Sequence, residues 1–398
     1  MKRLLLSTTL ALVMTGCSSV PEHNAIAEDH AMQAKPIGVD NTRYWGNELN
    51  FSYEYLEQVI NAQVKNQNEQ NSLDILALSG GGANGAFGAG ILAAWTETGV
   101  RPEFDMVTGI STGAILAIFA FLGEEYDDYV VDFYTNYSDG DLFQSKGLLA
   151  ALRSMSMFNI SPYEKMVRDT ITPDLLSMVA EGHNNGRLLL VGTTHLESQR
   201  FSVWNMGAIA AQNNEESEQL FENIILASTA IPGAMPAVQI DVKHNHIDYQ
   251  ELHVDGGVAR QVFFLPDTIL ASSLKNSALS KERNLYVIRN GEFLPQWKDL
   301  SPAVVEVSAR SLNTIIKYQG RSDVMRIYDQ ATQADIDFNF AHIDTDFTAK
   351  KQSKKQFDQE HMRKLFDYGY NKMAQGALWE KRPPEFDTLT VDLVTRKP

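Results

Sequence analysis

Apolar residues in the first half of the chain alternate between short runs and longer segments. Two runs of strand length, at 73–78 and 104–108, are each followed by a segment of helix length, at 86–98 and 114–122. The nine consecutive apolar residues of 114–122 would form a helix that is hydrophobic on all sides, so we expect this helix to be buried. The alternation of strand and helix predicts an α/β fold with a mostly parallel central sheet and helices on both faces.

The pattern continues toward the carboxyl end of the chain. One predicted helix begins at Ser301-Pro302, where proline occupies the first helical position. Its apolar positions are Val304, Leu312, Ile315 and Ile316. The other predicted elements are helices at 53–64 and 222–227 and strands at 187–194, 200–204, 252–254 and 284–288. With 398 residues, 44% of them hydrophobic, the chain can bury the core of one large domain or two smaller ones.

The first residues have the three regions of a secretory signal. Lys2 and Arg3 precede an apolar stretch at 4–14, and small residues follow it. The stretch is too short for a transmembrane helix. Cys17 directly follows Gly16 and is the only cysteine of the chain, which excludes an intramolecular disulfide. This order resembles the lipoprotein signal of bacteria, which places its lipidated cysteine in the same way.

The lipoprotein pattern implies an order of segments at the amino end. We expect a signal peptide at 1–16, a lipidated Cys17 that anchors the mature chain in a membrane, and a flexible polar tether at 17–45. The residue after Cys17 is Ser18 and not an aspartate. A serine at this position resembles the pattern that directs such proteins to the bacterial outer membrane. Met14 departs from the leucine that the pattern usually has. A plain secretory signal with an incidental cysteine is the alternative.

The chain is acidic, with a formal net charge of -16 and a pI near 5.0. It has no basic stripe that would replace the counterions of phosphate groups, so nucleic acid is not an expected partner. An evenly acidic surface would also repel anionic lipid at long range. Access to a membrane would then depend on an apolar patch or on a tether.

A glycine-rich loop follows the first predicted strand. Its glycines are Gly80, Gly81, Gly82, Gly85, Gly88 and Gly90. This density allows successive backbone N–H groups to turn toward one point, as an anion or a developing oxyanion requires. The loop also satisfies the dinucleotide fingerprint Gly-x-Gly-x-x-Gly. That fingerprint needs an acidic residue at the end of the next strand, whereas Asp105 lies near its start, so we expect no nucleotide.

The second predicted strand runs into the pentapeptide Gly109-Ile110-Ser111-Thr112-Gly113. Between a strand and a helix, a Gly-x-Ser-x-Gly sequence places its serine on a sharp turn, and the helix amino end helps to stabilise negative charge there. Side chains at Gly109 and Gly113 would collide where the two backbones crowd together. Ser111 is therefore the candidate nucleophile. The alternative is a turn in which Ser111 only caps the following helix.

A serine nucleophile needs a base, and none of the nine histidines stands in a setting that marks it. Asp255 ends a short apolar strand and is followed by Gly256 and Gly257, which let the chain turn away without covering the carboxylate. A carboxylate serves as this base only if partial burial raises its pKa and geometry holds it close to the serine. A plain turn at Asp-Gly-Gly is the alternative.

Together these motifs resemble those of the patatin-like phospholipase family, in the family's order over about 73–260. The resemblance implies a patatin-like three-layer α/β domain, expected here at 46–398 with a carboxyl-terminal α/β extension at 261–398. It also implies a Ser–Asp dyad without histidine, in which Ser111 is the nucleophile and Asp255 the base. It implies neither a cofactor nor a metal.

The resemblance assigns the glycine-rich loop to the oxyanion hole. The residues of this hole would be Gly80, Gly81, Gly82, Asn84 and Gly85. The family usually carries arginine or lysine where this chain has Asn84, so a positive charge is missing. Asn84 can still donate an amide hydrogen bond, and one preorganised donor contributes about 2.7 to 4 kcal/mol to a transition state. The segment 228–236 resembles the family's small-residue and proline segment, for which we expect a role in packing and turn geometry.

The sequence therefore predicts a serine acyl hydrolase that releases fatty acid from phospholipid or a related lipid ester. Lipid is the expected substrate, and the membrane is a partner reached through lipidated Cys17. Apolar side chains over the site would contact the acyl chain. Phe87, Trp95 and Phe119 are candidates for this contact, and a place in the core is their alternative role.

Three other functions stay open. An acyltransferase would use the same acyl-enzyme with an alcohol as acceptor. A non-catalytic, lipid-binding envelope lipoprotein would keep the fold, and Asn84 is the one feature in its favour. A metal-dependent hydrolase would use a ligand-rich segment whose spacing matches no established zinc pattern. Its residues are Asp241, His244, His246, Asp248 and His253.

Overall fold

The computed structural model describes most of the chain from residue 23 onward. The described residues are 23–36, 39–46, 72–145, 158–264, 282–349, 351, 353, 355 and 357–384. The predicted signal peptide at 1–16, the predicted lipidation site Cys17 and the predicted helix at 53–64 lie outside them. Among the described helices, none combines the length and the apolar character that a membrane span needs.

A mixed sheet of ten strands forms the centre of the described structure. The strands are β1 (Lys35–Pro36), β2 (Arg43–Trp45), β3 (Ser72–Leu78), β4 (Met106–Ile110), β7 (Leu188–His195), β8 (Arg200–Asn205), β9 (Val238–His244), β10 (Ile247–Asp255), β11 (Glu282–Glu292) and β12 (Asp337–Ile343). Along the main path their order is β1-β9-β10-β7-β4-β3-β11-β12, while β8 pairs with β7, and β2 pairs with β8. The consecutive strands β7, β4, β3, β11 and β12 of this path pair in parallel, and all the other pairs are antiparallel.

Helices surround this sheet. They are α2 (Glu28–Ala31), α4 (Gly85–Glu97), α5 (Thr112–Leu122), α6 (Asp127–Asn136), α7 (Asp139–Leu142), α9 (Ser161–Thr170), α10 (Pro173–Asn184), α11 (Met206–Ala210), α12 (Glu215–Thr229), α14 (Val304–Ala334) and α15 (Gln359–Ala374). Short 3-10 turns lie at Gly82–Asn84, Glu124–Tyr126 and Gly256–Val258, and β5 (Gln144–Ser145) pairs with β6 (Phe158–Asn159) in a separate small sheet.

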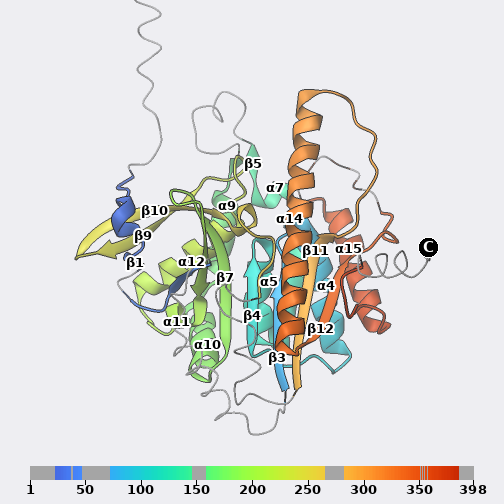
Figure 1. The fold of residues 1–398 in the computed structure, drawn as a ribbon, viewed down its shortest axis with the longest axis horizontal. Coiled ribbons are helices and arrows are strands. Elements are labelled where there is room, and N and C mark those ends of the chain that lie inside the picture. The colour runs from blue at the N-terminus through green and yellow to red at the C-terminus, as the bar shows by residue number, and fades with distance from the viewer. Residues whose placement is uncertain are drawn as a thin grey trace, which may run out of the picture.

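The sheet is covered on both faces, which confirms the predicted α/β architecture. Along β3, Leu76 and Leu78 belong to one apolar cluster with residues of α4, α5 and α12, whereas Ile75 and Ala77 belong to a second cluster with residues of α14. Figure 1 shows α14 on one face of the sheet and α4 and α5 on the other. Burial on both faces explains why the parallel strands read as continuous apolar runs.

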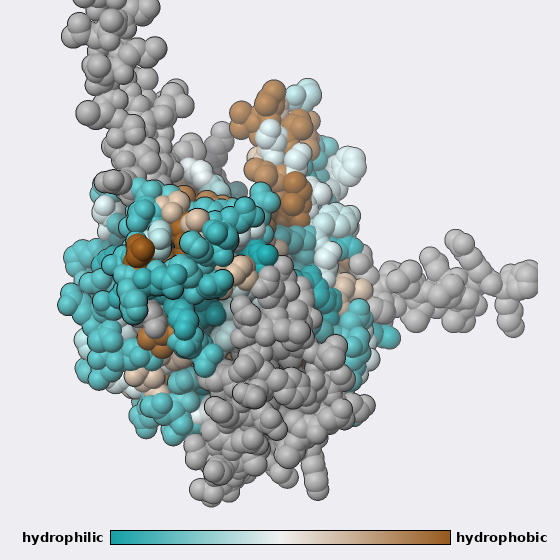
Figure 2. Space-filling model, turned by 60° about the vertical axis from the view of Figure 1, so that its left-hand side comes forward, coloured by the Kyte–Doolittle hydropathy of each residue, from teal (hydrophilic) through white to brown (hydrophobic). Residues whose placement is uncertain are grey.

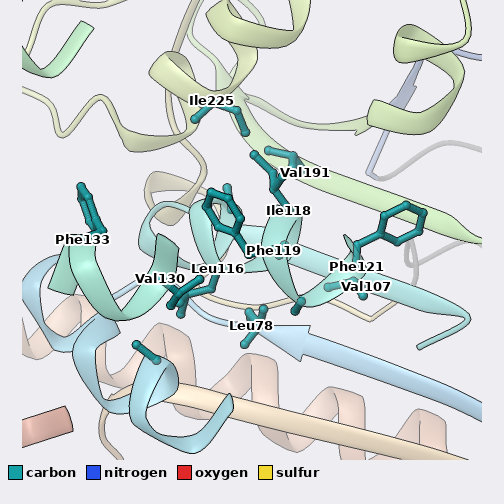
Figure 3. Packing of buried hydrophobic residues seen from close by; sticks show 14 of the residues in the cluster. Leu78, Val107, Leu116, Ile118, Phe119, Phe121, Val130, Phe133, Val191 and Ile225 are labelled. Carbon is teal, nitrogen blue, oxygen red and sulfur yellow. The ribbon is translucent and has the colours of Figure 1, made fainter. Parts of the chain in front are cut away.

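Helix α5 is buried, as its uniformly apolar sequence predicted. Leu116, Ile118, Phe119 and Phe121 are each at most 4% exposed. Their side chains leave the helix in different directions and meet apolar residues of the neighbouring strands and helices, such as Val191 (Figure 3). Because this helix starts directly after Ser111, its burial holds the candidate nucleophile in place.

Most of the predicted elements are present, with different bounds. The strands predicted at 187–194 and 200–204 are β7 and β8, which pair in antiparallel fashion. The prediction that a helix begins at Ser301-Pro302 is wrong, since α14 begins at Val304. The preceding residue, Ala303, has an extended backbone with φ -68° and ψ 137°, so Pro302 lies outside the helix.

The expectation of a flexible tether at 17–45 is wrong for its described part. Strand β1 pairs with β9, with Lys35 opposite Lys243, and β2 pairs with β8. Tyr44 and Trp45 are at most 2% exposed, so they supply the apolar surface that holds this segment on the sheet. The polar composition of the segment concealed these two aromatic side chains.

A buried ion pair also joins this segment to the sheet. Arg43 on β2 binds Glu251 on β10, and the side chains are 3% and 0% exposed. The Arg43 guanidinium lies 4.5 Å from the ring centroid of Trp45. An ion pair of this kind is costly to break, because the remaining partner stays buried without its counter-charge.

We expect Arg43→Met to lower the free energy of unfolding by about 3–5 kcal/mol, because it leaves the Glu251 carboxylate buried and unpaired. The matched control is Lys35→Met. It breaks an ion pair with Asp40 in which the side chains are 49% and 72% exposed, and exposed pairs contribute below about 1 kcal/mol. Urea unfolding of both variants tests this. Equal losses in the two variants would contradict a structural role for residues 39–46.

Candidate active site

Ser111 lies on a strained turn between β4 and α5. Its backbone has φ 56° and ψ -128°, a conformation that residues with side chains rarely adopt. The two flanking glycines make this turn possible. An added Cβ at Gly109 would lie 2.3 Å from the carbonyl oxygen of Gly113, and one at Gly113 would lie 2.4 Å from that of Leu78. This geometry is that of a nucleophile elbow, in which the serine is presented at the carboxyl end of a strand.

Asp255 at the end of β10 reaches the Ser111 side chain. The Ser111 Oγ–H donates to Asp255 Oδ2 over 2.7 Å, and the residues are 7% and 6% exposed. The other carboxylate oxygen, Oδ1, accepts from the N–H of Gly257 over 2.7 Å. An added Cβ at Gly256 would lie 2.5 Å from the carbonyl oxygen of Gly192 on β7, so only glycine fits here. The pair thus combines residues 144 positions apart in a water-poor site.

Burial gives Asp255 the protonation behaviour of a base. It raises the pKa of the Asp255 carboxyl to about 6, against the opposing effect of the hydrogen bonds from Ser111 and Gly257. A carboxylate with this pKa is ionised at neutral pH and binds a proton more strongly than an ordinary aspartate. Asp255 therefore has the raised pKa and the position close to Ser111 that a carboxylate base needs.

Ser228 at the carboxyl end of α12 holds the Ser111 backbone. The N–H of Ser111 donates to Ser228 Oγ over 3.0 Å, and the Ser228 hydroxyl donates to the carbonyl oxygen of Gly192 over 2.8 Å. The sequence had indicated only packing for the segment 228–236. Ser228 lies within this segment, but its neighbours in the sequence give no indication that it contacts Ser111.

The structure narrows the set of possible oxyanion donors in the glycine-rich loop. The N–H of Gly80 donates to the carbonyl oxygen of Gln261 over 2.9 Å, and that of Asn84 donates to Gly81 over 3.1 Å. The N–H of Gly85 is directed to the carbonyl oxygens of its own 3-10 turn. Gly81 and Gly82 differ, because their N–H groups donate to no atom of the described residues. These two are the donors that the loop leaves for a ligand.

Residues from the second half of the chain hold the glycine-rich loop. Asn290 on β11 donates through Nδ2 to the carbonyl oxygen of Ser79 over 2.9 Å, and its Oδ1 accepts from the N–H of Gly88 over 3.1 Å. The N–H of Gln261 in turn donates to Asp323 of α14 over 2.7 Å. Sequence reasoning did not find Asn290, Gln261 or Asp323, since no motif marks them.

The ligand-rich segment forms the hairpin of β9 and β10. Within the described residues, the possible metal ligands that come together are instead His195, Glu251 and His253, whose ligand atoms lie within 4.8 Å of one another. Glu251 is ion-paired with Arg43, and burial lowers the pKa of both histidines.

The hydrogen bonds of this group favour a structural role. His195 Nδ1 accepts from the N–H of Ser198 over 3.1 Å, so the proton of a neutral His195 ring lies on Nε2. A protonated Nε2 is not a metal ligand. His253 Nδ1 is in turn bonded to Thr193 Oγ1 over 2.9 Å. The group therefore fits an ion-pair and hydrogen-bond cluster better than a metal site.

The remaining candidates of the sequence lie away from the dyad. Asp105 precedes β4 and accepts from the N–H of Asp74 over 2.7 Å. It therefore lies at the amino end of the parallel strands, whereas the glycine-rich loop lies at their carboxyl end. Phe87, Trp95 and Phe119 are at most 4% exposed and belong to the larger apolar cluster. Their role is in the core.

Three solved structures resemble parts of the chain at low TM-scores. VipD from Legionella pneumophila is 11% identical with a TM-score of 0.37, and the match covers 92% of this chain and 72% of VipD. ExoU from Pseudomonas aeruginosa, solved in complex with SpcU, is 15% identical with a TM-score of 0.29, covering 67% of this chain and 52% of that one. Human GIVD cytosolic phospholipase A2 is 12% identical with a TM-score of 0.27, covering 68% and 50%. The chain thus spans about half the length of the last two.

Sequence comparison gives the assignment. No curated protein matches the chain. Residues 76–266 match the family model described as patatin-like phospholipase, and this range contains the glycine-rich loop, Ser111 and Asp255. The chain therefore contains a patatin-like phospholipase domain at residues 76–266.

Proposed function

We propose that this protein is a serine lipid acyl hydrolase in which Ser111 and Asp255 form the catalytic dyad. The patatin-like phospholipase domain is that of a lipid acyl hydrolase. The observation that carries the finer assignment is the 2.7 Å hydrogen bond from Ser111 Oγ to the buried Asp255 carboxylate, at a strained strand-to-helix turn. The proposed reaction releases fatty acid from phospholipid or a related lipid ester.

The dyad performs both halves of the reaction. Asp255 takes the proton of the Ser111 hydroxyl as Oγ forms a bond to the ester carbonyl carbon. The tetrahedral intermediate collapses, the ester C–O bond breaks, and Asp255 gives the proton to the departing alcohol. Water then attacks the acyl-enzyme while Asp255 accepts a proton from it. The acyl–Ser111 bond breaks, Ser111 regains its proton, and the fatty acid leaves.

We assign the oxyanion of each tetrahedral intermediate to the N–H groups of Gly81 and Gly82. The assignment is supported because neither N–H group donates to an atom of the described residues, whereas those of Gly80, Asn84 and Gly85 donate to backbone carbonyl oxygens. The amino end of α5 directs further positive potential toward the same place. Each preorganised donor contributes about 2.7–4 kcal/mol to the transition state. The amide of Asn84 is half-buried in the same loop.

Two alternatives use the same fold. An acyltransferase would pass the acyl group from Ser111 to an alcohol, and product analysis with added alcohol distinguishes it from the hydrolase. A non-catalytic lipid-binding lipoprotein would have no need for a strained serine bonded to a buried aspartate. The Ser111–Asp255 geometry therefore favours catalysis over binding alone.

The dyad predicts the effect of two substitutions. Ser111→Ala removes the attacking oxygen, and Asp255→Asn removes the proton acceptor, so we expect each to lower kcat on phospholipid vesicles by at least about 10³-fold. A serine-reactive fluorophosphonate should label the wild type and not Ser111→Ala. The matched control is Ser202→Ala, which changes a buried serine of β8 whose hydroxyl has no partner among the described residues. Fatty acid release that persists in Ser111→Ala would overturn the proposal.

A chelator separates the dyad from the metal alternative in the same assay. Because no step of the proposed reaction uses a metal, we expect excess chelator to leave fatty acid release unchanged. Activity that is lost with chelator and restored by an added divalent cation would instead support the metal-dependent hydrolase.

The raised pKa of Asp255 predicts the pH dependence of kcat/KM. Asp255 accepts a proton only when ionised, so we expect kcat/KM on a soluble ester to fall about tenfold per pH unit below a midpoint of about 6 and to level off above it. Burial also raises the pKa of Asp323 to about 6, so Asp323→Asn is the necessary control. A midpoint that moves in Asp323→Asn would assign the titration to Asp323 instead.

We further propose that the mature protein is anchored to the bacterial outer membrane through Cys17, with 1–16 as its signal peptide. The support is the sequence order of Lys2, Arg3, the apolar stretch and Cys17. In a bacterial host, an alkyne-tagged palmitate should label the full chain and should not label Cys17→Ser, while Ser19→Ala keeps the label. Labelling that survives in Cys17→Ser would refute the anchor.

A further inference from the structure

The amino-terminal half of α14 exposes an unusual number of apolar side chains. In Figure 1 this half extends beyond the sheet, and Figure 2 shows hydrophobic residues gathered on the projecting end. Val304 and Val305 are each 80% exposed, Ile315 is 63% exposed and Leu312 is 61% exposed. We call this surface the apolar arc. Its residues are Val304, Val305, Val307, Leu312, Ile315, Ile316 and Tyr318.

The apolar arc is one side of an amphipathic helix. At about 100° per residue, its members occupy about half of the helix circumference. The opposite side carries Glu306, Arg310, Asn313 and Lys317. A helix of a water-soluble domain normally directs its apolar side to the core, yet here that side faces away from the protein.

The polar side of the helix is the one in contact with the chain. The N–H of Ser301 donates to Glu306 Oε2 over 2.9 Å, and Lys317 Nζ donates to the carbonyl oxygen of Leu294 over 3.0 Å. Arg310 also donates to a backbone carbonyl, that of Gln296. The carboxyl-terminal half of the same helix packs into the second apolar cluster through Val324, Ile327 and Ala331. This packing and the hydrogen bonds together fix the rotation of the helix and leave the apolar side of its amino-terminal half outermost.

The apolar arc ends beside the Ser111–Asp255 pair. Gln319, one residue after the arc, donates through Nε2 to the carbonyl oxygen of Val258 over 3.2 Å and accepts through Oε1 from Gln261 Nε2 over 3.3 Å. Val258 follows the two glycines after Asp255 and is itself 49% exposed. Gln319 thus joins the carboxyl end of the apolar arc to the turn that follows the proposed base.

We propose that the apolar arc is the surface on which this protein docks to a phospholipid bilayer, with α14 lying in the membrane–water interface. The inference rests on the proposed function, since a lipid ester reaches the dyad from such a surface. The arc and the polar side opposite it contain one acidic residue, Glu306, and two basic ones, Arg310 and Lys317, in a chain of net charge -16. The charges of this part of the helix therefore sum to +1, so it does not share the repulsion that the acidic chain as a whole would have for anionic lipid.

Two further features favour a bilayer over a second copy of the chain. Trp297, 92% exposed, precedes the helix, and tryptophan is typical of the membrane interface. A second copy seated on the arc would also cover the surface next to Val258, which lies three residues after the proposed base. The arc is about 22 Å long, so it fits a helix lying along a membrane and not one crossing it.

A single fluorescent label tests the docking. Because Cys17 is the only cysteine, the full chain with Cys17→Ser carries neither another thiol nor the predicted anchor. We would add Ile315→Cys on the arc or Asn313→Cys on the polar side, and attach an environment-sensitive nitrobenzoxadiazole to each. On adding phosphatidylcholine vesicles we expect emission to rise at least about threefold for the label at 315 and little for that at 313.

The outcomes separate the possible occupants of the arc. No rise at position 315, or an equal rise at both positions, overturns the proposal. Emission at 315 that is high in buffer and insensitive to vesicles shows that protein already covers the arc. A dependence of that emission on protein concentration identifies the cover as a second copy, and its absence identifies a segment of the same chain; both results overturn the proposal.

Enzymatic activity provides a second, independent test of the docking. Leu312→Gln with Ile315→Gln makes the arc polar without changing charge, and Asn313→Gln with Thr314→Gln is the matched control on the same turn. We expect the first pair to lower fatty acid release from vesicles at least about tenfold while hydrolysis of soluble p-nitrophenyl butyrate stays within about twofold. Equal losses on both substrates would contradict docking. If the wild type hydrolyses neither, the proposed function fails, while the label at 315 still decides the docking.

Discussion

The strained turn at Ser111 is the constraint on which the proposed site depends. Its backbone conformation costs of order 1–3 kcal/mol and persists only where the surroundings impose it. Gly109 and Gly113 let β4, α5 and β3 approach more closely than side chains would allow. Ser228 fixes the N–H at the turn. Helix α5, which is largely buried, then prevents the turn from relaxing, so a packing feature of the core holds the proposed nucleophile.

The proposed mechanism needs Asp255 in its ionised form, whereas the folded state is more stable when this buried carboxyl is protonated. Burial raises its pKa to about 6, above the value of about 3.9 in an unfolded chain. Between these values the native state binds more protons than the unfolded state, so the free energy of unfolding falls as pH rises through this window and stays lower above it. The ionised carboxylate that the proposed mechanism needs therefore destabilises the fold. The parallel strands and their covering helices must offset this cost.

How much the sequence revealed depended on whether a feature was local. The parallel strands, the glycine-bracketed turn at Ser111 and the glycines after Asp255 are readable because each is a property of neighbouring residues. Ser228 and Asn290 were missed because their contacts join residues 117 and 211 positions apart. The engagement of the Gly80 N–H by Gln261 depends on a similar long-range contact. Strand β2 was missed because one short aromatic pair anchors an otherwise polar segment.

Helix α14 marks a different limit of sequence reasoning. The apolar positions of residues 304–316 predict an amphipathic helix, but periodicity alone does not say which side faces the protein. That choice is made outside residues 304–316. The later residues Val324, Ile327 and Ala331 of the same helix pack into the core, while the backbone carbonyls of residues 294 and 296 and the N–H of Ser301 bind the polar side. An acidic chain whose substrate is a lipid needs either an apolar patch or a tether to reach a membrane. The orientation of α14 supplies the patch at the end of the molecule where Asp255 and Ser111 meet. A tether alone would hold the protein near lipid without aligning the proposed dyad to it, whereas the proposed docking of α14 would provide that alignment.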